Sequence, residues 1–240
     1  MPRTLVILAT YNEIENVPTL AEEILRVLPT ADVLVIDDNS PDGTGKWCDE
    51  QNHREPRLKC VHRVGKLGLG TATLLGLQQA IDQGYEVAVT MDADWSHDPT
   101  FLNALLTATE HADVAIGSRY CPGGGIEGWP LHRRLMSRSI NALSRRMLRL
   151  PVQDASGAFR AYRIAILKQI NLASIQATGY AYLEEMLWLL NRAGATFAEV
   201  PIVFRDRRAG ASKISLQEAA AKISTLARLA RTRREPAPAN

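Results

Sequence analysis

Short apolar runs alternate with segments of helical periodicity through the first half of the 240-residue chain, and this alternation constrains the fold more than any other feature. Continuous apolar runs indicate strands that are buried on both faces, as in parallel sheets covered by helices. We therefore expect an α/β fold with a mainly parallel central sheet and helices on both faces. The predicted strands are 4–10, 32–38, 58–63, 85–94 and 113–119, and the predicted helices are 16–28, 44–53, 68–82 and 99–110.

Helices dominate the second half of the chain. The glycine-rich stretch 123–130 is a predicted loop, and 198–213 is a predicted last strand that runs into a basic loop. Predicted helices cover 131–150, 180–194 and 216–234, and the last is amphipathic with a basic C-terminal turn. The predicted organisation is a single Rossmann-like domain over 1–215, an amphipathic basic C-terminal helix over 216–234 and a disordered tail over 235–240.

Composition narrows the class of protein. The net charge is only +2 and no aromatic residues interleave with the basic helix, which argues against a nucleic-acid partner. Cys48, Cys60 and Cys121 are scattered without a CxxC or zinc spacing, which indicates free thiols in a reducing compartment. We find no signal peptide, and no window reaches the roughly 18 apolar residues that a membrane span needs. These features predict a cytoplasmic protein.

Carboxylates stand where the predicted strand 85–94 ends, at Asp92 and Asp94. Residues two apart in an extended segment point the same way, so both carboxylates can reach one site. Mg²⁺ and Mn²⁺ prefer such oxygen ligands and usually keep phosphate oxygens as further ligands. We therefore predict that Asp92 and Asp94 bind a metal and a phosphate, whereas Asp98, which precedes Pro99, caps the next helix.

A second strand ends in acids at Asp37 and Asp38. Acids at such positions either accept hydrogen bonds from a nucleotide base or ribose, or simply cap the turn that follows. One nucleotide diphosphate can span two acidic strand ends of the same sheet. The sequence therefore favours a nucleotide site but leaves both roles open for this pair.

Other motifs are less specific. The glycines of the stretch 66–76 match neither GxGxxG nor a phosphate loop, so they predict a tight turn into a helix, with Lys66 facing phosphate. The five histidines are dispersed and none has a predicted catalytic role. A departing diphosphate needs cationic help beyond a metal, and three cations in predicted loops after strands are candidates. They are Arg119, Arg207 and Lys213.

Nine motifs then occur in a fixed order, and together they carry a family resemblance. They are ATYNEIEN (9–16), VIDDNSPDGT (35–44), GKLGLGTA (65–72), MDADWSHDP (91–99), GSRY (117–120), GWPLHRR (128–134), DASGAFRAY (154–162), GYAYLEEM (179–186) and EVPIVFRDRRAGASK (199–213). The chain closely resembles the dolichol-phosphate (polyprenol-phosphate) mannosyltransferases of glycosyltransferase family 2. The resemblance covers about residues 4–215.

This resemblance implies a GT-A fold and an inverting transfer of mannose from GDP-mannose to a polyprenyl phosphate, with Mg²⁺ or Mn²⁺ as cofactor. Asp94 and Arg119 are the implied catalytic residues. Two positions depart from the usual family pattern: Ala9 replaces a proline, and Ser96 replaces a metal-binding glutamine of some members, so that water can fill that ligand position. The implied nucleotide and donor contacts are Tyr11, Glu13, Ile36, Asp38, Asp92, Ala93 and Asp94; the implied phosphate or acceptor contacts are Arg119, Arg134, Arg207 and Lys213; and the implied metal ligands are Asp92, Asp94 and Ser96.

The chemistry explains why no general base stands out. A phosphate monoester has a second pKa near ~6, so the acceptor oxygen is already ionised at neutral pH. In-line attack at the anomeric carbon would invert it and give a β-mannosyl phosphate. Two alternatives stay open: transfer of glucose from UDP-glucose to the same kind of lipid, and a non-catalytic nucleotide-sugar-binding module.

The lipid acceptor requires contact with a membrane. The predicted helix 131–150 carries an apolar stripe beside several arginines, an arrangement typical of a helix that lies on an anionic membrane surface. The same pattern also fits a stripe that faces the core while its arginines are solvated. We expect peripheral attachment at the cytoplasmic face, and a small membrane partner protein is possible on the family resemblance.

Overall fold

The computed structural model describes residues 2–177, 179–206 and 216–232, without the side chains of 216–221. Within these ranges the strands are β1 (Thr4–Thr10), β2 (Asp32–Asp37), β3 (Leu58–His62), β4 (Val87–Asp92), β5 (Val114–Ser118), β6 (Gly125–Ile126), β7 (Arg160–Arg163), β8 (Phe197–Pro201) and β9 (Val203–Phe204). The α-helices are α1 (Val17–Val27), α2 (Thr44–Asn52), α3 (Leu69–Asp82), α4 (Leu102–Ala108), α5 (Leu131–Leu148), α6 (Ile164–Leu167), α7 (Tyr182–Arg192) and α8 (Leu216–Thr232).

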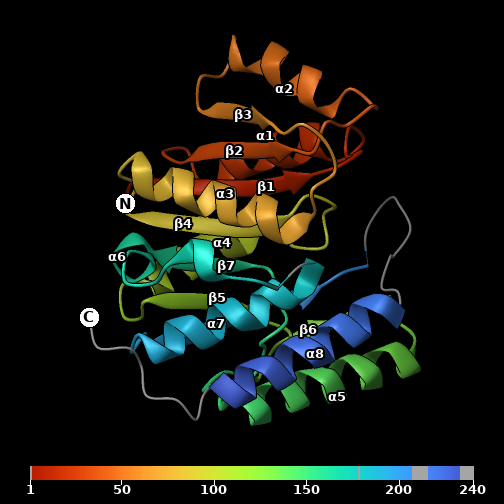
Figure 1. Cartoon of the computed structure of the whole chain (residues 1–240). Coiled ribbons are helices and arrows are strands. Elements are labelled where there is room, and N and C mark those ends of the chain that lie inside the picture. Colours follow the sequence, from red (N-terminus) through yellow and green to blue (C-terminus); the bar gives the residue numbers. More distant parts are fainter. Residues whose placement is uncertain (1, 178, 207–215, 233–240) are drawn as a thin grey trace.

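The central sheet has seven strands in the order β3-β2-β1-β4-β7-β5-β8 (Figure 1). β1 pairs in parallel with β2 and β4, and β5 pairs in parallel with β8. In this register Thr10 lies beside Asp37, and Ala9 lies beside Asp92. The parallel strands therefore bring the two acidic strand ends to one edge of the sheet, on either side of β1. The predicted α/β class, with a mainly parallel sheet, is confirmed.

Apolar side chains alternate between the two faces of the sheet, and both faces are buried. In β1, Leu5 and Ile7 belong to the core cluster that includes residues of α3 and α7, whereas Val6 and Leu8 belong to the cluster that includes residues of α1 and α4. A strand buried on both faces has to be apolar at every position, which is why these strands read as continuous runs. The predicted covering of both faces by helices is confirmed (Figure 1).

Strand β7 is the one central strand that the sequence did not predict. It runs antiparallel to both neighbours, β4 and β5. Arg160 begins it and is fully buried; its Nη1 donates to the Leu183 carbonyl at 2.9 Å and its Nη2 to the Ala155 carbonyl at 2.8 Å. A buried arginine in a strand of four residues interrupts the apolar pattern by which the other strands are recognised.

Helices α5, α7 and α8 form the C-terminal part of the molecule (Figure 1). Two ion pairs hold α8 on α7: Lys222 Nζ lies 2.5 Å from Glu184 Oε1, and Arg228 Nη2 lies 2.8 Å from Glu185 Oε2. Burial raises the pKa of Glu184, although Lys222 opposes that shift. Among the described residues, every helix is too short or too polar to cross a membrane.

The boundaries of the predicted helices agree with the structure to within a few residues. The helix predicted over 216–234 is described as α8 up to Thr232. The predicted disordered tail, 235–240, lies outside the described residues. The division of the chain at residue 215 stays a prediction.

Candidate active site

A cleft opens at the carboxyl ends of β1, β2 and β4, which is the edge where parallel α/β sheets bind ligands. The turn before α3 and Tyr180, which precedes α7, complete its walls. The cleft brings together most of the predicted nucleotide and donor contacts. The residues that line it are Ala9, Thr10, Tyr11, Glu13, Asp38, Lys66, Gly68, Leu69, Ala72, Asp92, Ala93, Asp94 and Tyr180.

The turn after β4 fixes the position of Asp94. This side chain is only 7% exposed, and its Oδ1 accepts hydrogen bonds from the backbone N–H of Ser96 at 3.1 Å and from the Ser96 hydroxyl. Trp95, between them, has a φ of +63°, a left-handed conformation that bulky residues rarely adopt. Such strain persists only where surrounding structure enforces it and is common at functional sites.

Three strand ends on this edge turn through a left-handed residue. Asn12 follows β1 with a φ of +61°, Asn39 follows β2 with a φ of +58°, and Trp95 follows β4. Asparagine adopts this conformation more readily than other side chains do, so the first two turns are compatible with their sequence. Trp95 has no such preference, and nothing in the local sequence signals its conformation.

The donor atoms in the cleft fit a hard divalent cation. Asp92 and Asp94 both line the cleft, and carboxylate oxygens are the ligands that Mg²⁺ and Mn²⁺ prefer. The predicted third ligand, Ser96, lies behind Asp94: its side chain is buried and its hydroxyl donates to the Asp94 carboxylate. The roles of these three residues toward a metal stay predictions.

His97 supports the same turn, although the sequence gave it no role. The backbone N–H of Asp92 donates to His97 Nδ1 at 3.0 Å, so Nδ1 carries no proton, and the 3.9 Å approach of Asp92 Oδ2 to it is not an ion pair. The ring stacks on Phe159 with centroids 5.0 Å apart. Burial lowers the pKa of His97 to about 4. A neutral, buried imidazole therefore anchors the end of β4.

The two acids after β2 take different positions. Asp37 is buried, and it accepts hydrogen bonds from the Thr10 hydroxyl at 3.0 Å and from the backbone N–H of Ser40 at 2.9 Å. It therefore caps the turn after β2, which is one of the two roles that the sequence left open. Asp38 instead lines the cleft.

Asp38 also organises the loop before α3. Its Oδ2 accepts from the backbone N–H groups of Leu67 and Gly68 at 3.0 and 3.1 Å, and its Oδ1 accepts from Arg63 Nε. The neighbouring Lys66 places its Nζ 4.1 Å from the centroid of the Tyr11 ring, a cation–π contact in the mouth of the cleft. The glycine stretch is thus a tight turn beside the cleft, as predicted.

Arg119 follows β5 and lies close to the acids of the cleft. Its Nε donates to Asp154 Oδ2 at 2.7 Å and its Nη2 to Asp154 Oδ1 at 2.8 Å, and Nη2 also donates to the Ser156 hydroxyl. Burial opposes the charge, but Asp154 outweighs it and raises the pKa of Arg119, with a smaller contribution from Asp92. Burial would also raise the pKa of Asp154, yet Arg119 lowers it to about 2.

Other predicted contacts lie elsewhere. Ile36 is fully buried in the core and does not line the cleft. Arg134, at the exposed start of α5, donates from Nε to the Trp129 carbonyl at 3.0 Å. Arg207 and Lys213 lie outside the described residues. Asp98 accepts from the backbone N–H of Thr100 at 3.0 Å and caps the following 3₁₀ turn, as predicted.

A mainly parallel α/β sheet with an acidic cleft at its strand ends is the arrangement in which such folds bind their ligands. The model for glycosyl transferase family 2 matches residues 5–170, and the chain belongs to this family. This result confirms the resemblance seen in the motifs.

Two curated relatives are similar over almost their whole length. Polyprenol monophosphomannose synthase of Mycolicibacterium smegmatis is 42% identical over 227 residues, which cover 92% of this chain and 86% of that protein. Undecaprenyl-phosphate mannosyltransferase of Micrococcus luteus is 42% identical over 213 residues, which cover 89% of this chain and 88% of that protein.

Solved structures support the fold. Glucosyl-3-phosphoglycerate synthase from Mycobacterium tuberculosis, solved in complex with Mn²⁺, UDP and glucosyl-3-phosphoglycerate, has a TM-score of 0.68 at 18% sequence identity. The match covers 99% of this chain and 82% of that one. At this identity the similarity shows the fold alone, and it confirms the predicted GT-A architecture.

Proposed function

We propose that the protein is a polyprenyl-phosphate mannosyltransferase that takes mannose from GDP-mannose. The observation that carries this proposal is the 42% identity, over about nine-tenths of the chain, to two proteins named for mannosyl transfer to polyprenyl phosphates. The acids that such a transfer requires, Asp92 and Asp94, both line the cleft. Loss of either acid would favour a non-catalytic module, and both are present.

The donor would lie across the carboxyl ends of β1, β2 and β4. Tyr11, Glu13 and Asp38 form the part of the cleft proposed for the nucleoside, and Asp92 and Asp94 form the part proposed for the diphosphate and its metal. Mg²⁺ or Mn²⁺, held by these two aspartates, would neutralise charge on the departing diphosphate. Ser96 and His97 hold the turn so that both carboxylates keep their positions before the donor arrives.

Arg119 is proposed to face the phosphate groups. Its two hydrogen bonds to Asp154 use Nε and Nη2, so Nη1 takes no part in that pair. Asp154 therefore fixes the guanidinium plane in advance, and fixed donors stabilise developing charge without reorganisation. Arg207 and Lys213, which follow β9 in the sequence, are proposed to add cationic contacts.

The reaction needs no strong general base. The acceptor phosphate is largely a dianion at neutral pH, because its second pKa is near ~6. One of its oxygens forms a bond to the anomeric carbon while the bond from that carbon to the nucleotide diphosphate breaks. Attack opposite the leaving group inverts the carbon, so an α-linked donor yields a polyprenyl β-mannosyl phosphate and GDP.

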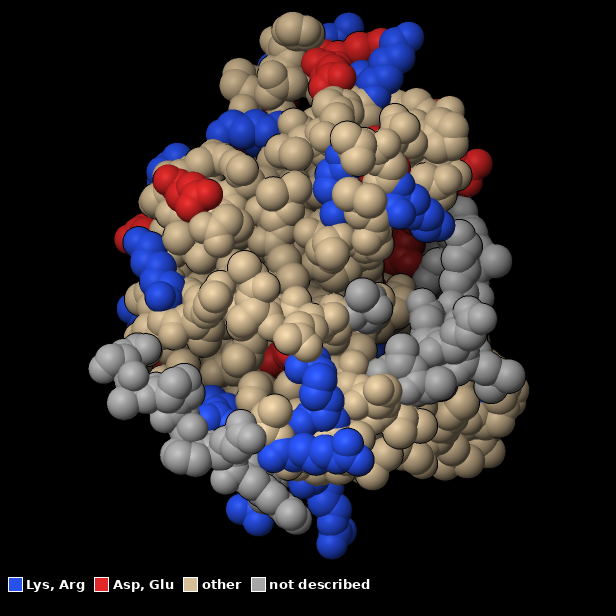
Figure 2. Space-filling model, in the orientation of Figure 1, with Lys and Arg blue, Asp and Glu red and all other residues tan. Residues whose placement is uncertain are grey.

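Helix α5 is proposed to hold the protein at the membrane surface, where the acceptor lies. Four of its apolar side chains are exposed, among them Leu131 at 72% and Leu135 at 55%, together with Met136 and Leu143. A stripe that faced the core would be buried, but the buried residues of this helix are Asn141, Ser144 and Leu148, and only the last of them is apolar. Figure 2 shows Lys and Arg side chains gathered over the lower end of the molecule, where α5 and α8 lie in Figure 1.

This combination of apolar and basic side chains is the one that binds anionic membrane surfaces. Peripheral attachment at the cytoplasmic face follows as part of the proposal. A small membrane protein that assists the attachment is compatible with the same surface.

The test follows radiolabel into the lipid phase from GDP-mannose or UDP-glucose in parallel, with the purified protein, a polyprenyl phosphate and Mg²⁺ or Mn²⁺. Metal-dependent mannosyl lipid that Asp94→Ala abolishes would support the proposal. Glucosyl lipid without mannosyl lipid would overturn the donor, and absence of labelled lipid from either donor in the presence of anionic vesicles would overturn the activity.

A further inference from the structure

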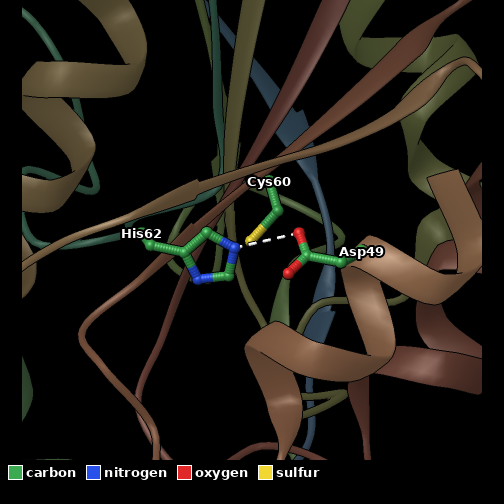
Figure 3. A group of neighbouring side chains, drawn as sticks. All are labelled: Asp49, Cys60 and His62. Carbon is green, nitrogen blue, oxygen red and sulfur yellow. Dashed lines mark hydrogen bonds and ion pairs between the residues drawn. The ribbon is translucent and has the colours of Figure 1, made fainter.

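Three side chains with metal-ligand chemistry meet at the edge strand β3 (Figure 3). Cys60 and His62 are two residues apart on β3, so both side chains leave the strand on the same side, and Asp49 reaches them from α2. Nε2 of His62 and Oδ1 of Asp49 are 2.9 Å apart. One ligand atom from each of the three residues lies within 4.8 Å of the other two.

We propose that Asp49, Cys60 and His62 form a second metal site, which binds a divalent transition-metal ion of the zinc class. The proposal does not rest on the mannosyltransferase activity. None of the three residues lines the cleft at the ends of β1, β2 and β4, so this site is separate from Asp92 and Asp94.

The spacing of the ligand atoms fits tetrahedral zinc. Bonds of about 2.0 to 2.3 Å at tetrahedral angles place neighbouring ligand atoms roughly 3.3 to 3.6 Å apart. The separations in the cluster, from 2.9 Å up to at most 4.8 Å, bracket this value. Small side-chain rotations are therefore enough to place all three atoms around one ion.

The ligand types select the metal. Thiolate and imidazole together favour zinc and its neighbours among the transition metals, whereas Mg²⁺ prefers oxygen ligands alone. Three protein ligands leave a fourth position for water. The side chains of His62 and Asp49 are 47% and 59% exposed, so an ion can reach them from solvent.

The surroundings of His62 support the assignment. A Cβ on Gly45, in α2, would lie 2.9 Å from both His62 Nδ1 and Asp37 Oδ2, so the glycine makes room for the imidazole beside the Asp37 carboxylate. Metal-binding histidines usually have a carboxylate or carbonyl near the ring nitrogen that does not bind the metal, which fixes the tautomer. Here Nε2 of His62 lies 2.9 Å from Asp49, and Asp37 pairs with His62 in the register of β2 and β3, so a second carboxylate is next to the histidine.

The charges around the thiol also favour a cation. The Cys48 thiol, burial and nearby carboxylates raise the pKa of Cys60. The carboxylates in question are Asp37 and Asp49. A bound cation would offset this negative surrounding and displace the thiol proton to solvent, so binding should strengthen as pH rises. The His62–Asp49 hydrogen bond joins two of the three groups, and the Cys60 thiol, which interacts with the Cys48 thiol, lies beside both.

The test titrates the full-length protein with Co²⁺ in excess Mg²⁺ and follows the near-ultraviolet charge-transfer band that appears when cobalt binds thiolate. The proposal expects a band that saturates at one equivalent and is displaced by Zn²⁺. Cys60→Ser should abolish the band, and His62→Gln should weaken cobalt binding by about tenfold or more. Cys121→Ser, which removes a buried thiol at a different place in the fold, and Asp94→Ala should both leave it unchanged.

No thiolate band, or a band that survives Cys60→Ser, would overturn the proposal, as would a band lost in Asp94→Ala. Circular dichroism of each variant without metal identifies those that fail to fold, and Asp49→Asn provides a second, solvent-exposed variant that should weaken binding. Mannosyl transfer measured on the same samples keeps the two proposals separate, because failure of the cobalt test leaves the transferase activity intact.

Discussion

Two buried carboxylates on the cleft edge and two in the C-terminal part of the molecule differ in whether a cationic side chain also holds them. On the cleft edge, Asp37 and Asp94 accept hydrogen bonds from backbone N–H groups two or three residues further along the chain. In the C-terminal part, Asp154 is held by Arg119, 35 residues away, and Glu184 by Lys222 on another helix.

The difference has an electrostatic consequence. A backbone N–H stabilises a carboxylate but adds no net charge, so Asp94 keeps its attraction for an external cation, whereas Asp38 in the same cleft is paired with Arg63. The charge of a carboxylate paired with arginine or lysine is balanced, so the pair stabilises the fold and does not attract a further cation. Aspartate and glutamate therefore form a ligand site in one half, and in the other they form the buried ion pairs Asp154–Arg119 and Glu184–Lys222.

The strongest test of this comparison is Asp94→Asn. The amide keeps an acceptor for Ser96 but loses the charge that attracts a cation, so we expect transfer to fall by about 10³-fold while the protein stays folded. Initial rates of label transfer and the thermal unfolding midpoint measure the two effects. Asp98→Asn is the matched control, because Asp98 caps a turn and pairs with the half-exposed Arg205 but does not line the cleft, and it should keep the wild-type rate. A rate for Asp94→Asn within tenfold of wild type would contradict the prediction.

Asp154→Asn should instead remove the buried ion pair between Asp154 and Arg119. Loss of one partner of a buried ion pair leaves Arg119 uncompensated and should lower the free energy of unfolding by about 3–5 kcal/mol at pH 7. Denaturant titrations of both proteins measure this difference.

The pH dependence of that difference is a further check. The pKa of Asp154 is about 2 in the folded protein against an ordinary value of 3.8. Its ionised form therefore stabilises the fold fully above about pH 4, and this stabilisation, of about 2 kcal/mol, is lost as pH falls toward 2. Wild type and variant should differ less at pH 3 than at pH 7. An equal difference at both pH values would argue against the pairing.

Lys222→Met tests the second buried ion pair, between Lys222 and Glu184. It leaves Glu184 buried without its cation, and we expect a loss of about 2 kcal/mol in unfolding free energy, because the carboxyl group, whose pKa is already raised, can take up a proton. The folded state of the variant then binds a proton that the unfolded state releases, so the loss should grow as pH rises from 5 to 8. Denaturant titrations at both pH values measure it.

Arg228→Met is the control, because it removes the other ion pair between α8 and α7, that of Arg228 with Glu185. Its partner Glu185 also accepts from two backbone N–H groups, and the Arg228 side chain is 35% exposed, so its loss should cost at most about 1 kcal/mol. Equal losses in Lys222→Met and Arg228→Met would show that burial does not separate the two pairs.

The smallest expected effect concerns the exposed face of α5. The double variant Leu135→Ser and Leu143→Ser should weaken binding to anionic vesicles by about tenfold, since each leucine contributes part of its ~1.5–3 kcal/mol of apolar burial. Stability should stay within about 0.5 kcal/mol, because both side chains are exposed. Vesicle sedimentation and thermal unfolding measure the two quantities.

Leu148→Ser provides the contrast for the membrane test. This side chain is buried at the other end of the same helix, so the change should destabilise the fold by about 2 kcal/mol or more. If the exposed double variant binds vesicles as wild type does, the membrane role of α5 is wrong.

Local patterns predicted most of the cleft edge. The strands β1 to β5 were visible as apolar runs, and Asp92, Asp94 and Asp38 were predicted at their ends because the carboxyl ends of parallel strands meet at one edge. The capping role of Asp98 followed from the proline after it. These features depend on residues that are close together in the chain, so the sequence contains their full pattern.

Contacts between distant segments were not predictable in the same way. In the sequence, His97 is one of five dispersed histidines. Only the folded chain shows that its ring accepts a hydrogen bond from the Asp92 backbone and stacks on Phe159. Strand β7 was missed because it begins with the buried Arg160, whose Nη1 and Nη2 donate to the carbonyl groups of Leu183 and Ala155, a feature that no apolar pattern shows.

The sequence by itself determined the alternating α/β architecture, the acidic strand ends and the family, because each is encoded in periodicity or in motifs a few residues long. The tertiary structure alone decided that Asp37 is a cap while Asp38 faces the cleft, that Asp154 fixes Arg119, and which side chains of α5 are exposed. Those outcomes depend on which surface each side chain meets after packing, and the energy of a buried charge is set by that neighbour and not by the residue itself.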